Sequence, residues 1–281
     1  MLFQMCKERH RQTPIKLRTI VVIVAVLLFG NFFSETHVLS AYEAKAPAHI
    51  KKPIWKSVLP YLLPETHPAK PKLDAIFSSQ RALLNLKTLE KAGFRNPKPR
   101  KYTHLIVTSH PDLEGYVIKL YVDAQRYYKD TPEWKYWILR IQGAHAIEHE
   151  IQRRGLQEYF KVPKKWIYAV PGKPQPSEEY LTKNFILIEE DMDLCTSKMN
   201  HSLWKGSTTD KELLQSLYSL LEDLGLKDCA KPDNVPFSID GKIAFIDTQT
   251  WGEWPVLYEK LTPFLSKEMK AHWKKLTKGA R

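Results

Sequence analysis

Residues 231–247 read KPDNVPFSIDGKIAFID, and the interpretation of the whole chain begins with this stretch. An Asp-Gly pair between two apolar runs is a strong signal for a β-hairpin with a two-residue turn. The runs 235–239 and 242–246 have equal length, so an antiparallel pairing would bring Asn234 and Asp247 together at the open end. An amide oxygen beside a carboxylate suits Mg²⁺ when phosphate and water complete its shell. A plain surface hairpin with capping Asn and Asp is the alternative.

A single lysine interrupts an apolar strand upstream. Residues 116–122, YVIKLYV, predict a strand with Lys119 in its middle, where burial without an anionic partner would be costly. A helix is expected over 134–155. At 100° per residue from Ile141, Glu148 lies at about 340° and borders the buried stripe. We expect Lys119 to pair with Glu148. The alternatives are a lysine that reaches solvent from an edge strand and an exposed glutamate at the rim of the stripe.

The remaining pattern is that of an α+β protein. Further strands are expected over 103–109, 165–170 and 184–189, and further helices over 211–224 and 258–276. Gly225 follows the first of these helices and is a good C-cap residue. Residues 42–102 are rich in Pro and Lys and predict a spacer interrupted by one helix at about 74–92.

The N-terminus predicts entry into a membrane pathway. A basic head precedes residues 19–33, TIVVIVAVLLFGNFF, which carry no charge. This pattern sends the following chain out of the cytoplasm. The apolar run is shorter than the roughly 20 residues of a full span. Residues 1–41 are therefore expected to be a cleaved signal peptide or a retained membrane anchor, with a buried core helix as the third reading. The domain beyond would be extracytoplasmic or secreted.

Charge and cysteines add weaker expectations. The 281-residue chain has a formal net charge of +12, which favours acidic lipid, nucleic acid or phosphate ligands. It has no zinc-ligand spacing and no basic motif interleaved with aromatic residues, so no specific nucleic-acid partner is expected. Beyond the apolar segment the cysteines are Cys195 and Cys229. A disulfide between them is one expectation for an exported domain.

The order of these features resembles the protein-kinase-like fold. Residues 116–119, YVIK, are similar to the family's Val-Ala-Ile-Lys strand. Residues 185–191, FILIEED, resemble the strand that enters the hinge between the lobes. Residues 231–234, KPDN, resemble Lys-Pro-Glu-Asn of the catalytic loop, and 240–247 resemble the hairpin that ends at the Asp of Asp-Phe-Gly. The resemblance covers about 103–250.

This resemblance implies a nucleotide site between two lobes, 103–192 and a shortened 193–281. Lys119 would hold the α- and β-phosphates of ATP and pair with Glu148. The backbone around Glu189, Glu190 and Asp191 would receive the adenine.

It also implies a metal site and a catalytic end. Asn234 and Asp247 would hold Mg²⁺, and Lys231 would approach the γ-phosphate. The family's catalytic Asp should stand where this chain has Cys229. Asp228, one position away, is the candidate base.

Other departures concern the loops. The Gly-rich phosphate loop is absent, because residues 109–115 contain one glycine. Asp247 is followed by Thr248-Gln249 instead of Phe-Gly. Only 34 residues follow Asp247, too few for a full activation segment and the helices that dock a peptide substrate.

Three functions follow as hypotheses. The first is an exported or membrane-anchored pseudokinase, a nucleotide-binding scaffold that recruits a protein partner. The second is a divergent ATP-dependent phosphotransferase with Asp228 as its base. The third is an exported α+β protein without a nucleotide site. Cys229 at the position of the catalytic base favours the first over the second.

Overall fold

A four-stranded antiparallel sheet organises the N-terminal half of the domain. In the computed structural model, which describes residues 45–78, 81–172 and 180–279, its strands lie in the order β1-β2-β5-β4. They are β1 (Ile106–Thr108), β2 (Tyr116–Leu120), β4 (Lys165–Ala169) and β5 (Phe185–Glu190). The register places Glu189 opposite both Val117 and Lys165, and Lys119 opposite Leu187. Because side chains alternate along strands, Lys119, Lys165 and Glu189 share one face.

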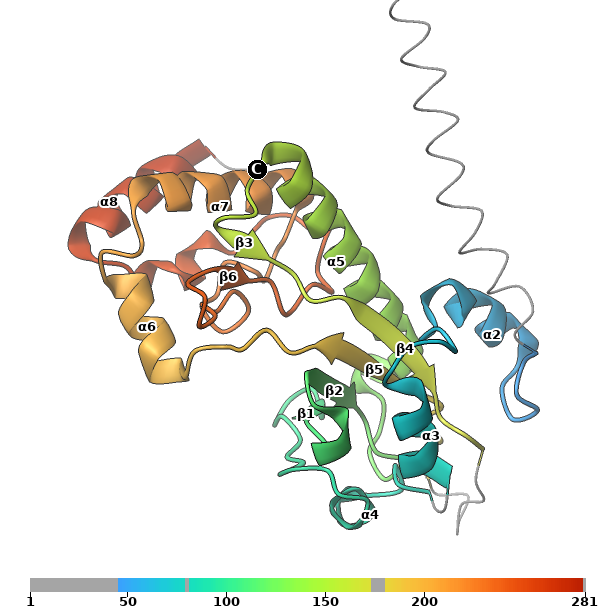
Figure 1. Cartoon of the computed structure of the whole chain (residues 1–281). Helices are drawn as coiled ribbons and strands as arrows, with labels where there is room; N and C mark the ends of the chain where they lie inside the picture. The colour runs from blue at the N-terminus through green and yellow to red at the C-terminus, as the bar shows by residue number, and fades with distance from the viewer. Residues whose placement is uncertain (1–44, 79–80, 173–179, 280–281) are drawn as a thin grey trace, which may run out of the picture. The chain divides into compact units, whose positions relative to one another are not determined.

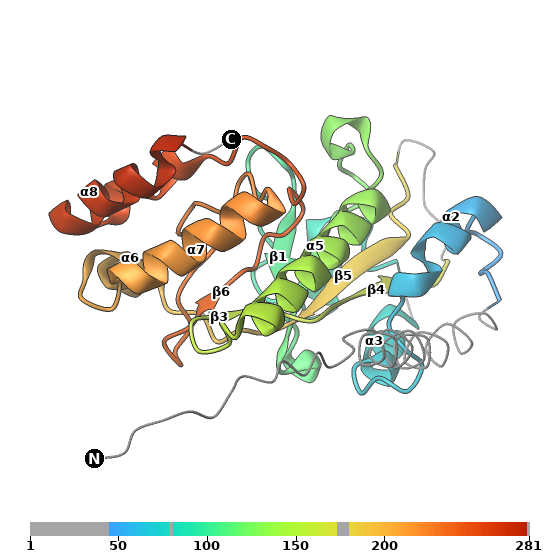
Figure 2. The same ribbon diagram turned by 90° about the horizontal axis from the view of Figure 1, so that it is seen from above.

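Helix α5 (Glu133–Arg154) covers that face. It runs along β4 and β5 in both views of the ribbon (Figures 1 and 2). Trp137 and Ile141 of the helix pack with Leu187 in one apolar cluster, and the Trp137 indole donates to the Phe185 carbonyl at 3.1 Å. The helix ends at Gly155, whose φ of 68° permits the left-handed cap. The predicted helix over 134–155 is confirmed.

The opposite face of the sheet is covered by residues that precede it. Helices α3 (Lys70–Ser78) and α4 (Leu86–Lys91) contribute Leu73, Phe77 and Leu89, which pack with Ile118 and Ile188. Helix α2 (Lys52–Val58) supplies Val58 to the cluster on the α5 face. The prediction of a spacer over 42–102 with one helix at 74–92 is therefore wrong. The segment is rich in proline and lysine, but it also contains leucines and phenylalanines that complete the core.

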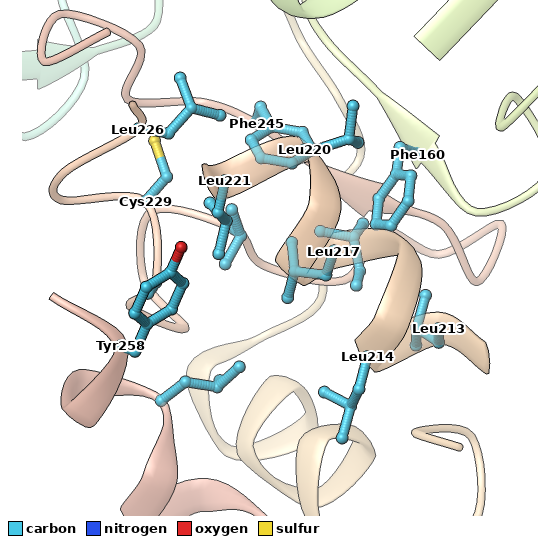
Figure 3. Packing of buried hydrophobic residues seen from close by; sticks show 14 of the residues in the cluster. Phe160, Leu213, Leu214, Leu217, Leu220, Leu221, Leu226, Cys229, Phe245 and Tyr258 are labelled. Carbon is cyan, nitrogen blue, oxygen red and sulfur yellow. The ribbon is translucent and has the colours of Figure 1, made fainter. Parts of the chain in front are cut away.

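The C-terminal half packs around helix α7 (Lys211–Leu224). The buried leucines of this helix recur at helical spacing and meet aromatic residues of the neighbouring segments (Figure 3). The helix ends at Gly225, with φ 57°, as predicted. The other regular elements are α6 (Ser197–Lys205), α8 (Lys267–Leu276), and the parallel pair β3 (Phe160–Lys161) and β6 (Ile243–Ala244). Short 3-10 helices span Leu59–Tyr61, Pro111–Leu113, Tyr128–Asp130, Tyr258–Lys260, Thr262–Phe264 and Thr277–Gly279.

The hairpin at 234–247 forms, but with a different turn. The Ser238 amide donates to the Lys242 carbonyl at 2.8 Å, and the Ile246 amide donates to the Asn234 carbonyl at 3.1 Å. The loop therefore has three residues, ending at Gly241 with φ 83°, which is the second common hairpin geometry. Asn234 lies opposite Ile246 instead of Asp247, so the predicted two-residue turn was wrong by one residue.

The predicted signal peptide or anchor over 1–41 lies outside the described residues. In the parts of the chain that the structure describes, no helix combines the length and apolar character needed to cross a bilayer.

Candidate functional site

A cavity of about 130 Å³ lies between the α5 face of the sheet and the open end of the hairpin. Its lining contains most of the residues that the sequence singled out as ligands of a nucleotide or metal. They are Lys119, Glu189, Glu190, Asp191, Asn234 and Asp247. Residues more than 100 positions apart are thus brought to one place.

A buried carboxylate between two lysines forms the wall contributed by the sheet. Glu189 accepts from Lys119 Nζ at 2.7 Å through Oε1 and from Lys165 Nζ at 2.8 Å through Oε2. Both ammonium groups also donate to the Ile246 carbonyl, at 2.9 and 3.1 Å. The predicted partner Glu148 is therefore wrong. The strand next to Lys119 supplies its counterion, and α5 does not.

Burial and neighbouring charges have opposite effects on the pKa values of Lys119 and Glu189. Burial lowers the pKa of Lys119 to about 8, and the attraction of Glu189 offsets only part of that effect. For Glu189, burial acts to raise the pKa, but the two lysines outweigh it and the pKa is lowered. One carboxylate thus balances two buried ammonium groups, and the wall carries excess positive charge at neutral pH.

Arg140 is a charged residue of this site that the sequence interpretation missed. Its Nη1 lies 2.7 Å from Asp247 Oδ1, and its Nε is buried without a hydrogen-bond partner. Burial acts to raise the pKa of Asp247, but Arg140 and Lys119 outweigh it and the pKa is lowered. A signal was present, because Arg140 lies at about 260° on the helix projection, inside the apolar stripe.

A glycine lets α5 approach the segment after Asp247. A Cβ on Gly143 would lie 2.0 Å from the Thr248 carbonyl oxygen. The Thr248 hydroxyl donates to the Arg140 carbonyl at 2.5 Å. Helix and loop are therefore fixed to each other at the residues that hold Asp247.

The turn 100–105 borders the cavity. Pro99 bridges to Ile106, and the Arg100 amide donates to the Leu105 carbonyl at 2.9 Å. Arg100 lines the cavity, is exposed, and has no hydrogen-bond or ion-pair partner for its guanidinium within the described ranges. The segment 109–115, where the sequence interpretation sought a Gly-rich loop, does not line the cavity. The turn contains no glycine and offers a guanidinium instead.

The end of β5 provides a free piece of backbone. The Glu190 amide donates to the Lys164 carbonyl, and the Asp191 amide donates to the Gly115 carbonyl. Met192 also lines the cavity, and its backbone N–H and C=O have no partner in the part of the chain that the structure describes. The unpaired backbone groups at this end of the lining are thus those of Met192, one position beyond the predicted 189–191.

The predicted catalytic residues do not line the cavity. Asp228 Oδ1 is 2.5 Å from Lys260 Nζ. Lys231 is exposed, with its Nζ 3.9 Å from Asp233 Oδ2. Asp233, by contrast, is in the lining. The structure therefore separates the candidate base from the lysines and acids that it brings together.

Cys229 and Cys195 are free thiols, so the pairing that the sequence left open is not formed. Cys229 is buried and its thiol donates to the Asp247 carbonyl at 3.1 Å. Burial raises the pKa of this thiol, which keeps it protonated. Cys229 therefore supports the backbone of Asp247 and is not a base.

Comparison with known proteins does not identify a family for this chain. No known family model matches the chain, and no curated protein matches it. Among solved structures, the complex of Rv3197 with erythromycin from Mycobacterium tuberculosis is similar over 88% of this chain and 73% of that chain. The sequence identity is 15% and the TM-score 0.29. The chemistry of the cleft therefore has to be derived from its own residues.

Proposed function

We propose that this chain is a kinase-like nucleotide-binding protein that acts as a scaffold, a pseudokinase, behind a membrane-targeting N-terminus. The observation that supports this most is the cavity itself. It combines a buried lysine–glutamate pair, a stretch of free backbone at the end of β5, and Asn234 and Asp247 of the hairpin. Clusters of ionisable groups with perturbed pKa values in a cleft are typical of ligand sites.

A nucleotide would enter with its base toward Met192 and its phosphates toward Lys119. Lys119 uses two donors, to Glu189 and Ile246, and an ammonium group has three, so one remains for a phosphate oxygen. A cavity of about 130 Å³ is smaller than the roughly 300–1,000 Å³ of most small-molecule sites. Binding would therefore require the turn 100–105 to move outward.

The position of Asp228 favours a scaffold over an enzyme. A general base must come within hydrogen-bond reach of the hydroxyl it activates, and the Asp228 carboxylate is engaged by Lys260 outside the lining. The alternative is a divergent phosphotransferase, and Asp233 favours it, because its exposed carboxylate does line the cavity. A γ-phosphate release assay separates the two, and we expect no turnover above background.

ATP should raise the melting temperature of the full-length protein by mass action, and Lys119→Met should remove that shift. The variant itself should remain well folded, because Glu189 keeps Lys165 as its partner. The measurement is thermal unfolding against ATP concentration, once with Mg²⁺ and once with chelator. Lys198→Met, on the exposed side of α6, is the control and should respond like the parent. If millimolar ATP leaves the melting temperature of the parent unchanged, both with Mg²⁺ and with chelator, the result would favour the third hypothesis, a protein without a nucleotide site.

The proposed location depends on residues 19–33. Arginine is strongly disfavoured inside an inserted apolar helix, so the double variant Val22→Arg, Val26→Arg should stay in the cytosol. Fractionation of cells that express the parent and the variant measures this. The control replaces the same valines with leucine and should leave export unchanged. Export of the arginine variant would contradict the targeting proposal.

A further inference from the structure

The kinase-like reading implies Mg²⁺ at Asn234 and Asp247, but the residues do not fit it. Asp247 Oδ1 already holds the Arg140 guanidinium at 2.7 Å. The Asn234 amide nitrogen donates to the Asp228 carbonyl at 2.8 Å, which leaves its Oδ1 as the one other protein oxygen of the implied pair, and the hairpin register places Asn234 opposite Ile246 instead of Asp247. An amide oxygen and a carboxylate suit Mg²⁺ when phosphate and water complete its shell. Here, however, the ion would have to compete with the Arg140 guanidinium for the carboxylate.

Arg140 cannot easily make room for a metal. Arg140 is 3% exposed. Its backbone carbonyl accepts a hydrogen bond from the Thr248 hydroxyl, which ties this part of α5 to the segment after Asp247. Gly143, one turn further along α5, brings the helix against the Thr248 carbonyl with no space for a Cβ. The guanidinium is therefore part of the framework of the cleft.

Four cations act on Asp247 at the proposed phosphate end of the cleft. Asp247 lies within electrostatic reach of Arg140, Lys119, Lys165 and Arg100. Asp247 and Glu189 pair with cations of this group, whereas the other acids of the lining, Glu190, Asp191 and Asp233, pair with none of these four cations among the described residues. Arg100 has no competing partner within the described ranges, and a guanidinium suits phosphate oxygens because it donates several hydrogen bonds in one plane.

We infer that the cleft binds the polyphosphate of a nucleotide without a divalent metal. Arg140 neutralises Asp247 where a metal ion would otherwise do so, and Arg100 contacts the phosphates from the turn that lacks glycines. This inference rests on the proposed nucleotide-binding function. It replaces the expectation of ATP with Mg²⁺ by one of ATP alone.

Calorimetric titration of the full-length protein with ATP, in EDTA and in excess Mg²⁺, tests this. We expect a Kd in EDTA no higher than that in Mg²⁺. Arg140→Gln should weaken binding in EDTA by roughly tenfold or more, as expected for loss of a charged donor, and Mg²⁺ should restore part of it. Arg153→Gln is the matched control, because Arg153 lies on the same helix and pairs with Glu150 outside the cavity, and the variant should bind as the parent does.

The outcomes are distinguishable. Binding by the parent that requires Mg²⁺ would overturn metal independence and leave the nucleotide site intact. No binding under either condition would overturn both proposals. If Arg140→Gln does not fold, Arg100→Gln on the exposed turn replaces it, and an unchanged Kd in EDTA for that variant would overturn the inference.

Discussion

Glu189→Gln is expected to lower the free energy of unfolding by about 3–5 kcal/mol, because it leaves two buried ammonium groups without a counterion. Lys119→Met should cost much less, since it leaves Lys165 and Glu189 as a complete pair. Denaturant unfolding of the full-length protein at pH 7 measures both. The order of the two variants is the informative result. Equal losses would mean that Glu189 does not balance both lysines.

A charge-free variant controls for this comparison. Buried ionic groups can often be replaced by apolar residues of similar volume without loss of stability. Methionine at positions 119, 165 and 189 together should therefore recover most of what Glu189→Gln loses. Failure to recover would assign the loss to packing or to the Ile246 carbonyl, which both lysines contact.

The same variants should differ in their dependence on pH. The pKa of Lys119 is lowered to about 8 from 10.5, so between these values the unfolded state binds more protons than the folded state. Stability attributable to Lys119 therefore rises as pH increases through that window. Glu189→Gln removes the attraction that supports the charged form of Lys119. In this variant the rise in stability should therefore begin at lower pH.

Gly143→Ala is expected to destabilise the protein by about 1–3 kcal/mol, the usual cost of overpacking. At an ordinary helix position the same change would stabilise by roughly 1 kcal/mol. Here the new Cβ would meet the Thr248 carbonyl oxygen at 2.0 Å, and backbone has to move. His145→Ala, exposed on the same helix, is the control and should be close to neutral. If Gly143→Ala is as stable as the parent, the backbone at Thr248 can move away from the new Cβ without a cost in stability.

The long elements could be predicted because local signals agree with tertiary burial. Helices α5 and α7 have apolar stripes and end at Gly155 and Gly225, both in the left-handed conformation that a glycine cap adopts. The sheet strands are apolar runs between turns. These features depend on residues close in sequence, so the α+β character could be predicted.

The errors arose where a local pattern fits two geometries or where distant residues decide the outcome. The hairpin is the first case, because an Asp-Gly pair fits both turn lengths and the observed register has Ser238 paired with Lys242, with the Ser238 hydroxyl on Asp240. The partner of Lys119 is the second case, because Glu148 was chosen for its place at the border of the buried stripe of the helix. Glu189 was visible as the last buried acid of an apolar strand, but its pairing follows from sheet order, which a single sequence does not give.

The site residues were predicted better than their roles. The resemblance to the kinase-like fold implied one cleft for Lys119, Asn234 and Asp247, and the structure brings all three into one cavity. Arg140 was not predicted, although its position inside the apolar stripe of the helix is as unusual for a charged residue as that of Lys119 in an apolar strand.

The contacts that complete the cleft also set the time at which it can form. Lys119 reaches the Ile246 carbonyl across 127 positions, and Arg140 reaches Asp247 across 107. During synthesis, which proceeds from the N-terminus, the sheet and α5 emerge first, before the residues that these cations contact. Such long-range closure is slow compared with helix formation. A nascent or prematurely terminated chain would therefore lack the pocket altogether, and any ligand of the pocket would distinguish finished molecules from fragments.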